Sequence, residues 1–148
     1  MITLQTNSVA ETEAFGEGLG RSAAAGMVLG LSGDLGAGKT AFVRGFARGL
    51  GYSGRVHSPT FGLINHYEGG RLPLFHLDLY RLESPEEIRA AGLEDYLVQP
   101  AGVSVVEWIE RWCGDALASA DGAGGFRRVY LQSVDDQIRK ISYDNAGA

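Results

Sequence analysis

Eight consecutive residues, Gly33-Asp-Leu-Gly-Ala-Gly-Lys-Thr40, combine three glycines with a lysine and a hydroxyl at a spacing that suits phosphate chemistry. Because glycine has no Cβ, the backbone of such a loop can approach a ligand closely and turn successive N–H groups toward phosphoryl oxygens. The amides expected to do so belong to Asp34, Leu35, Gly36, Ala37 and Gly38. Lys39 would add a compact positive charge for the terminal phosphates, and the hydroxyl of Thr40 would ligate Mg²⁺. The motif therefore predicts a site for a nucleoside triphosphate with Mg²⁺.

The residues on both sides of the motif predict the elements that would position it. An apolar run at 27–31 indicates a short buried strand. A helix is expected at 38–50, with Phe42 and Phe46 on its apolar face. The amino end of a helix directs free N–H groups and the positive end of its dipole at an anion. A strand, a glycine-rich loop and a helix in this order are typical of a P-loop.

Two carboxylates follow other predicted strands. Asp78 comes after a strand predicted at 72–77, and Glu107 follows a short apolar strand predicted at 103–106. Parallel strands of an open sheet end at one edge, so both carboxylates can face the phosphates. A P-loop needs such a group to hold the metal or to orient water, although either carboxylate could instead cap a helix or form a surface ion pair. His76 alternates with Asp78 on its strand and is expected beside the site.

The segment 58–60 lies between the helix of the motif and the next strand, which is predicted at 61–67. Pro59 disfavours helical backbone at the residue before it, which indicates a loop. A segment that senses the γ-phosphate would lie at this position, so Thr60 is a candidate site residue. A plain connecting loop fits the same pattern.

A helix is also predicted near the start of the chain, where Ser8 and Glu11 have the spacing of a capping box. Gly16, Gly18 and Gly20 lie inside that stretch, and each lowers its helix propensity. The capping signal favours a helix here, and the glycines weaken the prediction.

Strands and helices alternate over most of the chain. A second capped helix begins at Ser84, and the segments 128–134 and 138–143 predict a final antiparallel hairpin after a loop at 121–125. This pattern predicts an α/β fold, a three-layer P-loop NTPase fold with a mainly parallel sheet and antiparallel C-terminal strands. The length of 148 residues is that of one domain, so residues 1–148 are expected to form a single P-loop ATPase domain.

The composition excludes several classes of protein. A single cysteine, Cys113, excludes an internal disulfide framework and a cysteine-rich zinc site. No stretch of 18 apolar residues occurs, and the first residues lack the layout of a signal peptide, so we expect a cytoplasmic location without a membrane partner. The net charge of −5 does not favour nucleic acid. The Asn-Lys-x-Asp element by which small GTPases bind guanine is absent, which favours ATP.

Four further stretches occur in the order seen in one protein family: Ser-Pro-Thr-Phe at 58–61, His-Leu-Asp-Leu-Tyr-Arg-Leu at 76–82, Glu-Asp-Tyr at 94–96 and Val-Val-Glu-Trp at 105–108. Together with the glycine-rich motif they resemble TsaE, the small ATPases of bacterial threonylcarbamoyladenosine synthesis. The resemblance implies a P-loop fold ending in antiparallel strands, with ATP binding and slow hydrolysis. It also implies action with TsaD-like and TsaB-like proteins on the adenosine next to the anticodon, so that tRNA is met indirectly through the complex.

The resemblance implies roles for single residues. Lys39 and Thr40 would serve the phosphates and Mg²⁺, and Glu107 would be the carboxylate on the metal side. Asp78 would be an acid needed for activity, and Thr60 would belong to the switch-like loop.

Two more positions follow from the same resemblance. Trp108 would adjoin the site, and Arg139 stands in the place of a C-terminal arginine near the nucleotide. The chain departs from the family at Ala41, where a second threonine is frequent, and it matches poorly from residue 121 onward. These departures concern the adenine side of the nucleotide and leave the P-loop chemistry unchanged.

Two other functions are compatible with a P-loop. A small nucleotide or metabolite kinase would need an acceptor site and a lid whose arginines close over the phosphates, whereas residues 82–97 contain Arg89 but no such cluster. A nucleotide-gated binding module would bind ATP tightly without hydrolysing it. The ATPase subunit remains the leading hypothesis.

Overall fold

The computed structural model describes residues 2–33, 38–56, 64–113 and 126–143. Within these ranges the strands are β1 (Ile2–Thr6), β2 (Val28–Gly33), β3 (Ile64–Tyr67), β4 (Leu74–Asp78), β5 (Val103–Glu107), β6 (Phe126–Ser133) and β7 (Arg139–Tyr143). The helices are α1 (Val9–Ser22), α2 (Lys39–Gly49), α3 (Pro85–Ala90), α4 (Glu94–Val98) and α5 (Glu110–Cys113). None of the helices in this part of the chain has the length and apolar character needed to cross a membrane.

The strands form one mixed sheet in the order β1-β7-β6-β2-β5-β4-β3. The four central strands, from β6 to β4, run parallel, whereas β1, β7 and β3 pair antiparallel with their neighbours. The predicted α/β fold and the antiparallel C-terminal hairpin of β6 and β7 are therefore confirmed. The sheet has two antiparallel edges rather than one, because β3 pairs antiparallel with β4.

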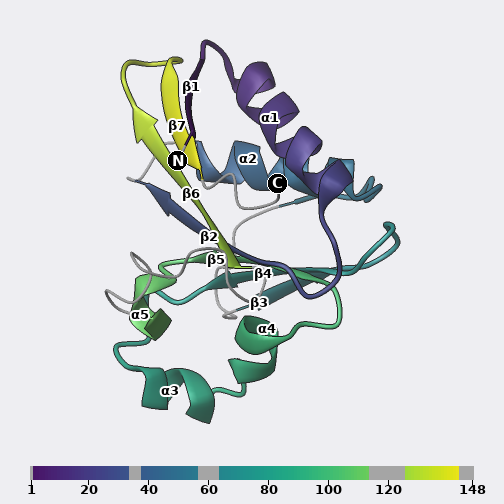
Figure 1. The fold of residues 1–148 in the computed structure, drawn as a ribbon, viewed down its shortest axis with the longest axis vertical. Coiled ribbons are helices and arrows are strands. Elements are labelled where there is room, and N and C mark those ends of the chain that lie inside the picture. Colours follow the sequence, from purple (N-terminus) through teal and green to yellow (C-terminus); the bar gives the residue numbers. More distant parts are fainter. Residues whose placement is uncertain (1, 34–37, 57–63, 114–125, 144–148) are drawn as a thin grey trace.

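The helices cover both faces of the sheet, with α1 and α2 on one side and α3, α4 and α5 on the other (Figure 1). Neighbouring residues of a central strand point to opposite faces, so Leu29 and Val105 belong to the core under α1 and α2. Val28 and Val106 belong to the core under α3 and α4. This arrangement confirms the predicted three layers.

Most of the predicted elements are present, with shifted ends. Ser8 caps α1, where its Oγ accepts a hydrogen bond from the backbone N–H of Glu11 at 3.1 Å, and Ser84 caps α3 in the same way. The strand predicted at 61–67 is described only from residue 64 onward, and the loop predicted at 121–125 lies outside the described residues. Three elements were missed: β1, whose partner β7 lies at the other end of the sequence, and the short helices α4 and α5.

The glycines that weaken the prediction of α1 are explained by its packing on α2. A Cβ on Gly16 or Gly20 of α1 would overlap a backbone carbonyl oxygen of α2, and a Cβ on Gly45 or Gly49 of α2 would overlap one of α1. Gly18 has no atom within 4 Å of the place where its Cβ would lie. Gly16, Gly20, Gly45 and Gly49 therefore let the two helices approach backbone to backbone, and this contact fixes the position of α2, which begins at Lys39.

Candidate functional site

The two ends of the glycine-rich motif have the geometry of a tight connection between β2 and α2. Gly33, the last residue of β2, has φ 151°, and Gly38, the residue before α2, has φ 96°. A Cβ on Gly33 would overlap the carbonyl oxygen of Leu131 on β6, so the position requires glycine. The loop between these ends, Asp34, Leu35, Gly36 and Ala37, lies outside the described residues, and its amide cradle remains a prediction.

The structure brings the lysine of the motif to the carboxylate at the end of β5. Lys39 is the first residue of α2, and its Nζ lies 3.4 Å from Oε1 of Glu107. The side chains are 14% and 8% exposed, respectively, so the pair is largely screened from solvent. β5 is the parallel neighbour of β2, with Glu107 in register with Leu31. The end of β5 was expected to lie beside the start of α2, and the contact between Glu107 and Lys39 shows that it does.

A histidine holds the second oxygen of the same carboxylate. Nε2 of His76, a fully buried side chain on β4, lies 2.7 Å from Oε2 of Glu107. Burial alone would raise the pKa of Glu107, but the hydrogen bond and charge of His76, together with the charge of Lys39, outweigh it and hold the pKa below its ordinary value of 4.5. Glu107 is therefore a carboxylate at neutral pH.

Asp78 is the neighbour of Glu107 across the sheet. It ends β4, in parallel register with Glu107 at the end of β5, and its side chain is half-buried. Its Oδ1 accepts a hydrogen bond from the backbone N–H of Tyr80 at 2.9 Å, which fixes the carboxylate at the start of the following turn. Thr40 is the second residue of α2, whereas Thr60 lies outside the described residues.

Arg139 lies at the other side of the motif. It is the first residue of β7, and its Nε is 3.7 Å from the place a Cβ on Gly38 would take. The guanidinium donates hydrogen bonds to the carbonyls of Asp135 and Ile138, at 2.7 Å and 3.0 Å. Arg139, which only the family resemblance indicated as a site residue, therefore lies against the end of the glycine-rich segment.

Sequence reasoning gave no role to an aromatic and arginine cluster beside Lys39. Trp108 adopts φ 61°, a left-handed conformation rare for a large side chain, and its ring centroid lies 5.9 Å from Nζ of Lys39. The ring of Tyr80 is 5.0 Å from that of Trp108, and the guanidinium of Arg111 lies 5.4 Å from Trp108 and 5.8 Å from Tyr80. Trp108 was expected next to the site, but Arg111 carries no signal in the sequence because only the turn after β5 brings it there.

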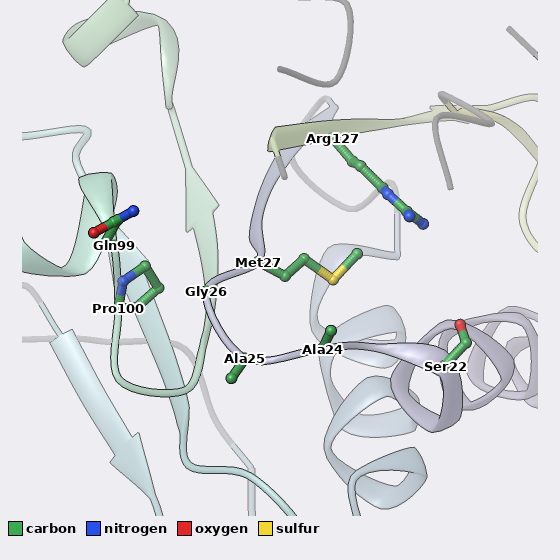
Figure 2. Close-up of a pocket in the computed structure, with 8 residues that line it drawn as sticks. All are labelled: Ser22, Ala24, Ala25, Gly26, Met27, Gln99, Pro100 and Arg127. Carbon is green, nitrogen blue, oxygen red and sulfur yellow. The ribbon is translucent and has the colours of Figure 1, made fainter. Parts of the chain in front are cut away.

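A small cleft of about 200 Å³ opens beside Lys39 at the end of β2. It is lined by Leu31, Ser32, Gly33, Lys39, Trp108, Glu110 and Tyr130. A larger cleft of about 610 Å³ lies at the opposite ends of the central strands, where Met27 and Arg127 reach toward the end of α1 (Figure 2). Its lining includes one charged side chain, Arg127, and no carboxylate. Lys39, the partner of Glu107, therefore lines the smaller cleft.

Comparison with known proteins finds a family that this chain resembles over most of its length. Residues 6–140 match the sequence profile of the family described as "Threonylcarbamoyl adenosine biosynthesis protein TsaE". The TsaE protein of Nostoc sp. is 50% identical over 96 residues, which cover 63% of this chain and 59% of that protein. The TsaE protein of Bacillus subtilis is 49% identical over 98 residues, covering 66% and 60%. The matched part thus spans about three fifths of the length of these two relatives.

The likeness extends to a third bacterial relative and to a solved structure. The TsaE protein of Treponema pallidum is 44% identical over 106 residues, covering 72% of this chain and 77% of that protein. The crystal structure of YdiB from Bacillus subtilis superimposes with a TM-score of 0.73 at 33% identity, and the match covers 96% of this chain and 83% of that one. With a family profile matched over most of its length and relatives this similar, the chain belongs to the TsaE family.

Proposed function

We propose that this chain binds ATP with Mg²⁺, hydrolyses it slowly, and thereby supports threonylcarbamoyladenosine modification of tRNA next to the anticodon. The observation that carries the proposal is the largely screened ion pair of Lys39, at the amino end of α2, and Glu107, at the carboxyl end of β5. A lysine at the start of a helix, facing a carboxylate at the end of the adjacent parallel strand, is the arrangement by which P-loop proteins hold phosphates and their metal. The relatives from Nostoc sp. and Bacillus subtilis are tRNA threonylcarbamoyladenosine biosynthesis proteins, which supports the same modification.

The residues around the pair fit a magnesium–nucleotide complex. In such sites Mg²⁺ takes one or two protein oxygens and completes its shell with phosphates and water. The Thr40 hydroxyl and the ionised Glu107 carboxylate supply oxygens of this kind. Among the described residues no group of three or more His, Cys, Asp or Glu is placed to hold a metal alone, as a structural zinc site would require. When bound, Mg²⁺ would neutralise charge on the β- and γ-phosphate oxygens.

Each of the remaining site residues would have a separate role in hydrolysis. Lys39 would leave Glu107 for the β- and γ-phosphates, where its positive charge stabilises the charge that develops on the transferred group. Asp78, next to Glu107 at the edge of the sheet, would orient the attacking water. Thr60 would sense the γ-phosphate, and Arg139, packed against Gly38, would contact the nucleotide on the side away from β5.

The partners proposed are a TsaD-like protein, which carries the transfer chemistry, and a TsaB-like protein. The net charge of −5 gives this chain no general attraction for RNA, so tRNA would be met through the complex. A pull-down of the TsaD-like and TsaB-like proteins of the same cell, with and without ATP, tests this part. Recovery of neither protein under either condition would contradict it.

A kinase is disfavoured by the position of Arg89, the arginine of residues 82–97, where a lid would be sought. Its guanidinium lies 5.0 Å from the ring centroid of Trp112 and its Nε lies 3.6 Å from Oε1 of Glu94, so it is engaged on α3, α4 and α5. Transfer of labelled phosphate from ATP to a small acceptor would nevertheless favour the kinase. Tight ATP binding without phosphate release, even with the partners present, would favour the non-enzymatic module.

The chain offers a matched pair for testing the nucleotide site, because Lys39 and Lys140 are its two lysines. We expect Lys39→Ala to weaken ATP binding by about 10- to 100-fold, the equivalent of one charge-assisted contact. Lys140→Ala, on the exposed side of β7, should leave affinity unchanged. Isothermal titration calorimetry measures both, with circular dichroism to confirm folding. Equal affinities for the two variants would refute the nucleotide site.

A further inference from the structure

The carboxylate of Glu107 is fixed from two sides by side chains of different elements. Oε1 faces Nζ of Lys39 at 3.4 Å, and Oε2 faces Nε2 of His76 at 2.7 Å. The contact to His76 is the shorter of the two, and it links the neighbouring strands β4 and β5. The contact to Lys39 instead depends on a long, flexible side chain. Because one oxygen is held by a buried ring, the other is directed at the start of α2.

His76 is an unexpected residue for its position. Its neighbours on β4, Leu74, Phe75 and Leu77, are buried and apolar, and its own side chain is completely buried. A carboxylate accepts hydrogen bonds, so Nε2 carries the proton of the bond to Glu107. Within the described part of the chain, Nδ1 is buried without a hydrogen-bond partner. Burying an imidazole with one nitrogen unsatisfied costs free energy that an apolar residue would not.

The contact to Glu107 becomes more important when nucleotide binds. Under the proposed function, Lys39 turns to the phosphates and its contact with Oε1 is lost or weakened. His76 then remains the side chain that keeps the carboxylate in its rotamer, because its ring is fully buried and has no freedom to follow the ligand. A carboxylate that must ligate a metal needs such support, since small errors in ligand orientation weaken binding strongly.

We infer that His76 is a positioning residue, which holds Oε2 of Glu107 so that Oε1 is presented to Mg²⁺ at the phosphates. The inference rests on the proposed function. His76 itself touches neither metal nor nucleotide; it acts through Glu107. Its effect should therefore appear in the Mg²⁺-dependent part of nucleotide affinity and leave the metal-free part, which Lys39 and the loop supply, unchanged.

The test compares ATP affinity with and without Mg²⁺ by calorimetry in three variants of the full chain. His76→Leu removes the hydrogen bond and keeps an apolar side chain of similar volume. His76→Gln places an amide N–H where Nε2 was, and His76→Asn places one where Nδ1 was, out of reach of Glu107. His66→Leu is the matched control, because His66 is an exposed histidine of the neighbouring strand β3, and its ring meets that of Phe75 edge-on.

Mg²⁺ is expected to raise ATP affinity, and we expect this increase to be about 10- to 100-fold smaller in His76→Leu and His76→Asn than in wild type. The affinity for ATP without Mg²⁺ should be unchanged. His76→Gln should recover most of the gain, and His66→Leu should keep all of it. Should His76→Leu fail to fold, the contrast between Gln and Asn carries the same information. A full Mg²⁺ gain in His76→Asn, or a Gln variant as impaired as Asn, would overturn the inference alone. A wild-type chain without any Mg²⁺ gain would overturn the proposed function and this inference together.

Discussion

Replacing Gly16 by alanine tests the close contact that positions α2 and hence Lys39. A Cβ at this position would overlap the carbonyl oxygen of Phe42 and lie 3.1 Å from the backbone nitrogen of Phe46. Both are backbone atoms of α2, so no side-chain rotation can relieve the overlap and the helices must separate. Gly18 lies two residues along the same helix, where an added Cβ meets no atom within 4 Å.

The two substitutions change helix propensity equally and packing differently. Gly18→Ala should stabilise the fold by about 0.5–1 kcal/mol, because alanine loses less backbone entropy in a helix interior. That gain corresponds to a rise of about 1–4 °C in melting temperature for a chain of this size. Gly16→Ala has the same gain but incurs an overpacking cost of about 2–3 kcal/mol, which leaves a net loss of about 1–2.5 kcal/mol.

Urea unfolding followed by circular dichroism measures both stabilities, and ATP titration measures the effect on the site. We expect the two variants to differ by about 2–3 kcal/mol, with the sign reversed between them relative to wild type. Gly16→Ala should also weaken ATP binding, because Phe42 follows Lys39 by one helical turn. If both variants are equally stabilised, α1 and α2 are not packed backbone to backbone, and the reasoning is refuted.

Three further predictions concern single side chains. Asp78→Asn keeps the acceptor for the N–H of Tyr80, so the melting temperature should stay near that of wild type. The substitution removes the carboxylate charge, and ATP turnover should therefore fall about 10²-fold. A large drop in melting temperature with normal turnover would contradict this. Because the pKa of Glu107 is lowered, its ionised form stabilises the fold above pH 4.5, and this stability is lost as pH falls through the folded-state pKa. Glu107→Gln should therefore make the free energy of unfolding depend less on pH in the acidic range. An unchanged pH dependence would count against the His76 and Lys39 contacts. Arg71→Ala removes hydrogen bonds of 2.9–3.1 Å to three carbonyls at the end of α1 and should cost about 1–2 kcal/mol in urea unfolding, whereas no loss would mean that water replaces them.

The part of the site that depends on local pattern could be predicted from the sequence. A run of apolar residues before the glycines and an amphipathic run after them define the start of α2, and strand ends define where Asp78 and Glu107 meet. The side of the strand on which His76 lies follows from alternation alone. Its bond to Glu107 does not, because either residue could have found another partner.

The features that were missed depend on contacts between distant segments. Gly16 lowers helix propensity in any local assessment, and only the backbone of α2 shows why a larger residue is excluded there. β1 is short and half exposed, and its pairing with β7 joins the two ends of the sequence. Trp108 has a positive φ, which turns the chain so that Arg111 lies against its ring. Glycine is the residue usually found in this conformation, so a tryptophan at this position gives no sign of the turn in the sequence.

The position of the indole rings has a practical consequence. The chain contains two tryptophans, Trp108 and Trp112, and both pack on the α3 side of the sheet. The ring of Trp108 lies 5.9 Å from the ammonium that is expected to move on to the phosphates, and the guanidinium of Arg111 lies against the same ring. Under the proposed function, the fluorescence of Trp108 should therefore change when ATP binds, which would provide a reporter without a label for stopped-flow measurement of how fast ATP arrives and leaves.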